Sequence, residues 1–210
     1  MFREDIKRAA EDNGIRFLLH FTRAENLNSI FRYGILSVSK QKSLSLEVSR
    51  NDPNRYDEFL NATSVSIHLP NNILLYKYKN KFNCEWVVLG IKPDIIWEKR
   101  CGFCNENAAS SNVSKIPLNK RMSVESLNGL FNNISGKPSR SKLNIDKSLT
   151  TSPQAEVLVF EDIEPSYIWG VAFESNYAKN KYKENIPSSI KIEIVPELFR
   201  FAIRPDYLHW

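Results

Sequence analysis

The sequence predicts an α+β fold with a mixed or antiparallel sheet at its core. Short apolar segments typical of strands outnumber segments with helical periodicity, and long polar stretches join them. The chain has 210 residues, 42% of them hydrophobic, which suffices to bury one sizeable core. No repeat or linker divides the sequence, so we expect residues 1–210 to form a single domain.

The N-terminal part predicts a helix, a strand and a second helix. Residues 2–13 are charged and helical in character, and an Asn-Gly pair ends them. Residues 15–21 are apolar and predict a first strand that ends at His20. Residues 23–33 place apolar side chains at helical spacing, and Gly34 follows where a C-terminal cap glycine belongs.

Later strands are predicted from short runs that are rich in branched and aromatic side chains. These runs cover residues 63–69, 85–91, 155–160, 167–173 and 190–194. Short helices are expected over residues 73–78, 95–97 and 124–132. The aromatic tail, residues 201–210, is expected to add an edge strand. Residues 39–60 are polar and predict a long loop or short helix pieces, and the rest of 105–150 is also polar. A long loop in a compact domain is usually functional or disordered.

The charge balance is compatible with a polyanionic partner. The chain carries 29 Lys and Arg against 24 Asp and Glu, a formal net charge of +5. One Ser/Asn-rich stretch contains many of the basic residues: Lys115, Lys120, Arg121, Lys137, Arg140, Lys142 and Lys147. Such a stretch either binds phosphates without sequence specificity or is a solvated loop, and both interpretations stay open.

The sequence also predicts a cytoplasmic protein without a metal site. No stretch approaches the roughly 18 apolar residues of a membrane helix, and the charged N-terminus lacks the apolar core of a secretory signal. Three cysteines argue against a disulfide framework. Cys101 and Cys104 have CxxC spacing, but no second ligand pair accompanies them, so burial as small hydrophobic residues is favoured over metal binding.

His20 and Thr22 form the first candidate site. They lie where an apolar strand gives way to a helix, so their polar atoms can bind a ligand beside the helix N-terminus. The alternative is a core histidine bonded to backbone groups, with Thr22 as a helix N-cap. The residues alone favour this second interpretation.

Arg55 and Glu156 are the other candidates. Arg55 stands among turn residues, where it can bind a pyrophosphate in bidentate fashion or simply form a surface ion pair. Glu156 leads directly into an apolar strand, and an acid that is desolvated in this way is a candidate for catalysis, although it can also be a plain strand-end residue. No glycine-rich phosphate loop or nucleophile motif is present, so any nucleotide must be held by side chains and ordinary backbone.

Five segments of the sequence resemble the DarT family of bacterial DNA-modifying toxins, and two of them, residues 86–89 and 104–110 (CNENAAS), resemble one branch of it. RFLLHFTRAENLNSIFRYGIL (residues 16–36) resembles the family's opening strand and helix. Residues 52–78 resemble its segment in which a loop arginine precedes a serine-rich strand and a Pro-Asn turn. QAEVLV (residues 154–159) is similar to its Gln-Ala-Glu segment, and the matches occur in the family's order across roughly residues 15–175.

The resemblance implies a fold like the diphtheria-toxin and PARP-type transferases, with two small sheets and an NAD⁺ cleft between them. It implies that His20 and Thr22 bind the nicotinamide side of NAD⁺, with Asn28 lining the same cleft. It also implies that Arg55 binds the phosphates or the attacking base and that Glu156 is catalytic. Arg50, five residues before Arg55, is the alternative arginine.

The same resemblance implies an NAD-dependent mono-ADP-ribosyltransferase that modifies thymine or guanine in single-stranded DNA. Its implied partner is a DarG-like antitoxin whose macrodomain removes ADP-ribose, and a monomer is expected. Because a base must be unstacked to react, a single-stranded acceptor is favoured. Tyr56, Tyr76 and Tyr78 either stack on that strand or pack in the core. The competing hypotheses are a non-catalytic nucleic-acid-binding module and a transferase that acts on RNA or protein.

Overall fold

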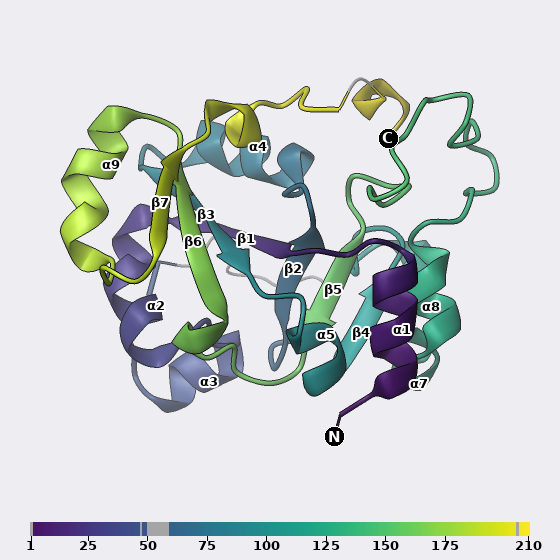
Figure 1. Cartoon of the computed structure of the whole chain (residues 1–210), viewed down its shortest axis with the longest axis horizontal. Coiled ribbons are helices and arrows are strands. Elements are labelled where there is room, and N and C mark those ends of the chain that lie inside the picture. The colour runs from purple at the N-terminus through teal and green to yellow at the C-terminus, as the bar shows by residue number, and fades with distance from the viewer. Residues whose placement is uncertain (1, 47, 50–58, 205) are drawn as a thin grey trace.

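A seven-stranded sheet forms the centre of the computed structural model, which describes residues 2–46, 48–49, 59–204 and 206–210. Within those residues the strand order is β4-β5-β2-β1-β3-β6-β7 (Figure 1). The strands are β1 (Leu18–Arg23), β2 (Thr63–Ile67), β3 (Trp86–Ile91), β4 (Cys101–Cys104), β5 (Glu156–Val159), β6 (Ile168–Phe173) and β7 (Lys191–Ile194). Neighbouring strands are antiparallel except for the parallel pair β6 and β7.

The sheet is split between β1 and β2. Only Leu18 and Leu19 of β1 pair with β2, opposite Ile67 and Ser66. By contrast, β1 pairs with β3 over its whole length. The two central strands therefore separate beyond Leu19, and the sheet consists of a β4-β5-β2 part and a β1-β3-β6-β7 part. This arrangement confirms the predicted α+β fold with a split sheet.

Helices and turns cover both faces of the sheet. The α-helices are α1 (Glu4–Asp12), α2 (Leu27–Tyr33), α3 (Val38–Ser43), α4 (Asn72–Lys81), α5 (Ile95–Glu98), α6 (Ser111–Ser114), α7 (Leu118–Arg121), α8 (Val124–Gly129) and α9 (Asn176–Tyr182). Short 3-10 helices are η1 (Ala24–Asn26), η2 (Pro165–Tyr167), η3 (Lys183–Asn185), η4 (Pro196–Phe199) and η5 (Tyr207–His209). None of the helices in the described ranges is long and apolar enough to cross a membrane.

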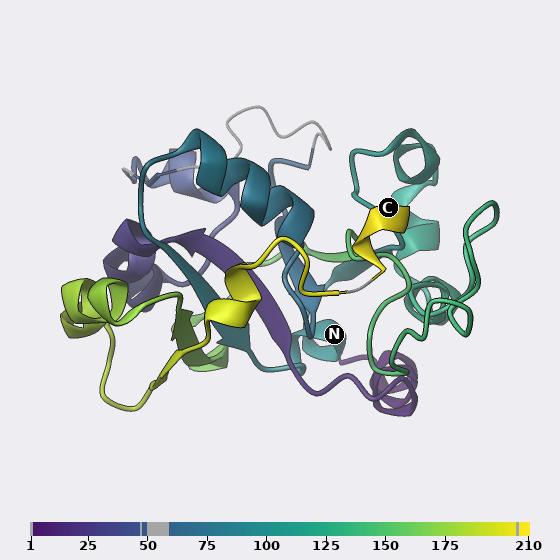
Figure 2. The ribbon, with the colours of Figure 1, turned by 90° about the horizontal axis from the view of Figure 1, so that it is seen from above.

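The main core lies on one face of the sheet and spans the split. It joins apolar side chains of α1, α2, α5, α8 and α9 to inward-facing residues of both sheet parts, such as Val65 of β2 and Leu89 of β3. On the opposite face, α4 packs over β1 and β3 through Leu75 and Tyr78. Figure 2 shows α4 and α1 on opposite sides of the sheet. The shared core fixes the two sheet parts relative to each other, so the gap between β1 and β2 has a defined shape.

Most predicted elements are present, with shifted ends. The strands and helices expected between residues 60 and 195 are all present and overlap their predicted ranges. Gly34 ends α2 at φ 90°, as predicted, and an added Cβ there would collide with the carbonyl of Ile163. The first strand, however, continues past His20 to Arg23, because its ladder with β3 extends that far.

One strand was not predicted, and one expectation is wrong. The segment Cys101–Cys104 is the strand that was not predicted, β4, and it pairs with all four residues of β5. The tail is not an edge strand. After η4 it runs beside α4 to the loop that precedes β5, where a buried Arg204–Asp206 ion pair holds it (Figure 1).

Candidate active site

A cavity of about 580 Å³ opens where β1 and β2 separate. Its walls come from β1, η1, α2, β2 and α4, together with the segments around residues 107–109 and 154–156. His20, Thr22 and Glu156 all line it, although they come from distant parts of the sequence. The volume lies in the range typical of sites for small molecules and cofactors.

His20 reaches across the split in the sheet. Its Nδ1 lies 2.9 Å from the carbonyl oxygen of Ser64 in β2. Because a carbonyl oxygen only accepts, Nδ1 must carry the hydrogen, which fixes the orientation of the ring. The local reason is the alternation of a strand, which places His20 and Thr22 on the same side of β1.

Thr22 is buried beside η1 and is bonded to Asn26. The Asn26 side-chain nitrogen donates to Thr22 Oγ1 at 3.0 Å and to the Ser49 carbonyl at 2.9 Å. The Ser49 N–H donates in return to Asn26 Oδ1 at 3.1 Å. Thr22 belongs to β1, so the interpretation of this residue as a helix N-cap is wrong. Asn26 instead joins the end of β1 to Ser49, and all three residues line the cavity.

Glu156 is the first residue of β5 and is half-buried at the mouth of the cavity. One carboxylate oxygen accepts a hydrogen bond from the Ser64 hydroxyl, and the other accepts one from the backbone N–H of Ala108. The apolar residues that follow it are fully buried in the sheet. Strand pairing and two donors therefore hold the carboxylate toward the cavity, as a charge-stabilising or proton-accepting role requires.

Ser64 connects the two walls of the cavity. Its carbonyl accepts from His20 and its hydroxyl donates to Glu156. Sequence reasoning did not single it out. The signal was the alternation of Ser64, Ser66 and His68 with apolar residues, which predicts a polar face of the strand but not that this face meets a cavity.

The structure brings together only part of the predicted site. Asn28 is exposed on α2 and is not among the described residues that line the cavity, whereas Asn26, two residues earlier, is. Arg50 and Arg55 lie outside the described residues. In the part of the chain that is described, the cationic side chains on the cavity wall are Lys77 and Lys81 of α4.

The predicted basic stretch divides into two kinds of residue. Arg121 is buried, with its guanidinium 5.0 Å from the ring centre of Phe59. Arg140 donates to backbone carbonyls of its own loop, including that of Leu149 at 2.9 Å. These two arginines stabilise the fold. Five lysines of the stretch remain exposed: Lys115, Lys120, Lys137, Lys142 and Lys147.

The structure also shows which of the predicted tyrosines pack in the core. Tyr78 is buried and stacks on Trp86 with ring centres 6.2 Å apart, whereas Tyr76 is exposed. Tyr56 lies outside the described residues.

Cys101 and Cys104 are both buried, and their side chains belong to different apolar clusters on opposite faces of β4. Burial raises the pKa of Cys101 to about 12. The described residues contain no group of three or more metal-ligating side chains.

The chain is similar in fold to several solved structures. One is the Thermosipho africanus DarTG structure in complex with ADP-ribose, which matches 88% of this chain with a TM-score of 0.64 and 18% identity. The chain spans about half, 51%, of that DarTG chain. The Thermus sp. 2.9 DarT structure in complex with ADP-ribosylated ssDNA is similar over 89% of this chain and 97% of its own length, with a TM-score of 0.64 and 13% identity. The same Thermus protein in complex with NAD⁺ has a TM-score of 0.58 and 14% identity, over 95% of this chain and all of the other.

These likenesses place the chain among proteins with an ADP-ribosyltransferase-like split sheet. The family is shown by its sequence model, described as "ssDNA thymidine ADP-ribosyltransferase, DarT", which matches residues 19–200. The chain belongs to the DarT family. A search of curated proteins finds no match.

Proposed function

We propose that this protein transfers ADP-ribose from NAD⁺ to the thymine base of single-stranded DNA. Membership in the DarT family supports this reaction. The observation that carries it is the joint placement of His20 and Glu156 on one cavity, both bonded to Ser64. NAD⁺ is a co-substrate in this proposal and is consumed.

Glu156 has the position and chemistry of the catalytic carboxylate. Breaking the bond between nicotinamide and ribose C1′ builds positive charge on the ribose, as in glycoside hydrolysis, and a nearby carboxylate stabilises that charge. Nicotinamide leaves with the electron pair of this bond. A ring nitrogen of the base forms the new bond to C1′, and its proton passes to Glu156 and then to solvent.

The opposite wall has the chemistry to bind and orient NAD⁺. His20 and Thr22 present a ring nitrogen and a hydroxyl on one face of β1, and Asn26 fixes Thr22. Holding the ribose in line with the acceptor base supplies much of the rate in such a reaction. Asn28 stays in the proposal as a residue that contributes to NAD⁺ binding. Asn26 is the stronger candidate for this contribution, because it lines the cavity.

Arg55 is proposed to bind the phosphates of NAD⁺ or the attacking base, with Arg50 as the alternative. An arginine matches the geometry of a pyrophosphate better than a lysine does. Replacing each arginine by alanine and measuring NAD⁺ binding by calorimetry decides between them. We expect Arg55→Ala to weaken binding about tenfold and Arg50→Ala to change it less than twofold, because one bidentate contact is worth roughly one to three kcal/mol.

The biological role that we propose is that of a toxin in a toxin–antitoxin or phage-defence system. The similar Thermosipho africanus chain is a DarTG protein, about twice as long as the aligned part. A DarG-like antitoxin that removes ADP-ribose is the partner we propose for residues 1–210, which we take as one catalytic domain. Because NAD⁺ and chromosomal DNA meet in the cytoplasm, the protein is proposed to act there.

Labelled NAD⁺ tests the reaction. The protein is incubated with single-stranded oligonucleotides that contain or lack thymine, with an RNA oligonucleotide, and with a protein lysate. We expect label only on thymine-containing DNA, and a fall of about 10²- to 10³-fold in rate for Glu156→Gln, because an electrostatic stabiliser is lost. Glu11→Gln, at an exposed acid of α1, is the matched control and should keep full activity.

The other outcomes each point to a different hypothesis. Label on DNA without thymine moves the acceptor to guanine or another base. Label on RNA or protein alone keeps the NAD⁺ chemistry and replaces the acceptor. An absence of label and of NAD⁺ consumption favours a non-catalytic nucleic-acid-binding module. Activity that survives Glu156→Gln contradicts the catalytic role of this residue.

A further inference from the structure

A nearly buried ion pair anchors the C-terminal tail. The side chains of Arg204 and Asp206 are 4% and 3% exposed, and Arg204 Nη2 lies 2.6 Å from Asp206 Oδ2. Arg204 Nε donates to Oδ1 of the same carboxylate at 2.9 Å, so the contact is bidentate. Trp210 Nε1 also donates to Asp206, at 2.8 Å. These bonds fix the plane of the Arg204 guanidinium.

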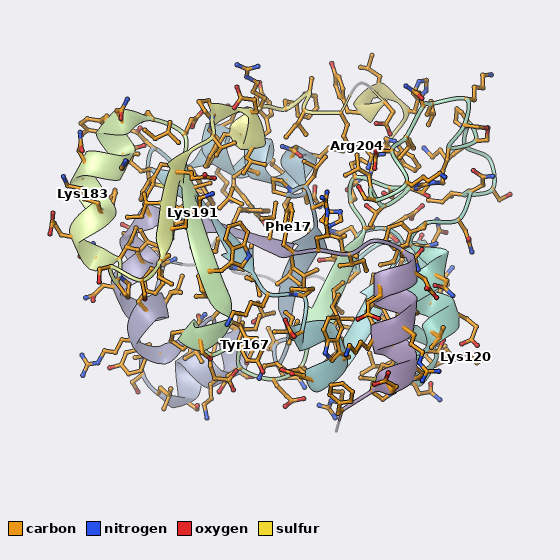
Figure 3. All side chains as sticks on the ribbon, in the orientation of Figure 1. Phe17, Lys120, Tyr167, Lys183, Lys191 and Arg204 are labelled. Carbon is orange, nitrogen blue, oxygen red and sulfur yellow. The ribbon has the colours of Figure 1, made fainter. Side chains whose placement is uncertain are left out.

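The other donors of Arg204 bind the loop that precedes β5. Nη1 donates to the Thr150 carbonyl at 2.8 Å, and Nη2 donates to the Thr151 carbonyl at 3.0 Å. Both threonines are buried, so these carbonyls depend on protein donors. Figure 3 shows Arg204 between the yellow tail and the green loop.

Arg204 completes a set of side-chain donors along this loop. Arg140 donates to the carbonyls of residues 146, 147 and 149, and His68 Nδ1 donates to that of residue 148. With the two bonds from Arg204, six successive carbonyls, those of residues 146–151, accept from side chains. The loop contains no helix or strand at these residues. It is held by His68, which follows β2, by Arg140 of the loop itself and by Arg204 of the tail.

The loop leads directly to the cavity. The Thr150 hydroxyl donates to the Ser152 carbonyl at 2.8 Å. The Gln154 N–H donates to Ser152 Oγ at 3.1 Å, and the Ala155 N–H donates to the Ser152 carbonyl at 3.2 Å. Gln154 and Glu156 then line the cavity wall. A short bonded path therefore joins the carbonyls that Arg204 holds to the carboxylate at the active site.

We propose that Arg204 is a positioning residue, which sets the approach of residues 150–154 and thereby the placement of Glu156. The inference rests on the proposed function, because it assigns Glu156 to the reaction. The family model ends at residue 200, so Arg204 and Asp206 lie beyond the part of the chain that the model matches. Arg204 itself touches neither substrate in this proposal.

The test replaces the ion pair as a unit. The double variant Arg204→Gln/Asp206→Asn removes both charges, so that no buried charge is left without a partner. Arg204→Lys keeps the charge but lacks the planar fork that reaches two carbonyls. The matched control is Arg200→Gln/Glu197→Gln, an exposed ion pair with N and O 3.7 Å apart at the residues just before the tail. Each variant is compared with the wild type for melting temperature, kcat and KM for NAD⁺, and hydrogen exchange of the amides of residues 151–156.

In folded variants of Arg204 we expect kcat to fall about tenfold, with KM for NAD⁺ within twofold, because a small misplacement of a reacting group costs rate more than binding. Faster exchange at residues 151–156, with β1 still protected, should accompany this loss. The inference is overturned if kcat stays within twofold of the wild type, or if kcat and KM both change in proportion to lost stability. A wild type that fails to consume NAD⁺ contradicts the proposed function instead.

Discussion

The two walls of the cavity are held in different ways. The β1 wall, with His20, Thr22 and Asn26, is built from residues close together in sequence. Asn26 bonds to Thr22 four positions away, and the wall is tied to the rest of the fold through Ser49 and Ser64. The β5 wall carries Glu156, and the loop before it is held by three side chains far apart in sequence: His68, Arg140 and Arg204.

This difference predicts that substitutions on the two walls affect different kinetic constants. A strand followed at once by a 3-10 turn sets the positions of its side chains by local geometry. A long loop has no such geometry, so its backbone carbonyls need side-chain donors, which here come from Arg140 of the loop itself and from His68 and Arg204. We therefore expect substitutions on the β1 wall to affect mainly NAD⁺ binding, and substitutions that reach Glu156 to affect mainly the rate.

Ser64→Ala is expected to have the largest effect among the tests of this comparison. It removes the hydroxyl that donates to Glu156 but keeps the carbonyl that accepts from His20. Because a hydrogen bond to a charged group is worth about 1.5–3 kcal/mol, kcat should fall about tenfold or more, with KM for NAD⁺ nearly unchanged. Steady-state kinetics with varied NAD⁺ measures both constants.

Ser66→Ala is the control for Ser64→Ala. Ser66 lies in the same strand and also lines the cavity. Its replacement should leave kcat within about threefold, since Ser64 and Ala108 still donate to the Glu156 carboxylate in this variant. Equal losses of kcat in the two variants would mean that the strand, and not the Ser64–Glu156 contact, limits the rate.

Asn26→Ala should produce a smaller effect of a different kind. It removes the bonds that hold Thr22 and Ser49 on the β1 wall. KM for NAD⁺ is expected to rise about fivefold with kcat within twofold, the pattern of lost ground-state binding. Asn28→Ala, at an exposed position of α2, is the matched comparison. A rise in KM for Asn28→Ala alone would assign the NAD⁺ contact to Asn28.

His68 should give the smallest effect, on stability and not on the reaction. Burial lowers the pKa of His68; the Ser148 carbonyl and Asp146 oppose this shift, and the charge of Arg16 adds to it. Its Nε2 accepts from the Arg16 N–H while Nδ1 donates to Ser148, so the folded state needs the neutral ring. As the pH falls below about 6.5, the unfolded chain binds a proton first, and stability is lost until the folded His68 also titrates.

Melting temperatures between pH 7.5 and pH 5 test this expectation. The wild type should melt at a lower temperature as the pH falls through this window, whereas His68→Gln should show a flatter dependence. His209→Gln, at an exposed histidine, should behave as the wild type does. Identical slopes for the wild type and His68→Gln would show that other groups cause the dependence.

The sequence predicted the elements better than their ends and connections. Strand and helix periodicity located the strands that carry Ser64 and Glu156, because those signals are local. The extension of β1 through Thr22 was missed, since it depends on pairing with β3. The strand β4 was missed for the same reason: four residues have little pattern of their own, and only pairing with β5 makes them a strand.

For the site, the sequence by itself determined the residue types and their approximate settings. It placed His20 and Thr22 at the end of one apolar strand and Glu156 at the start of another. A polar residue next to an apolar run can be recognised from the order of residues alone. Only the tertiary structure decided that these residues share one cavity, that Ser64 joins them, and that Arg204 lies against the loop before Glu156. Those contacts link residues 44 to 92 positions apart, or arise from the separation of β1 and β2, which pairing and core packing determine together.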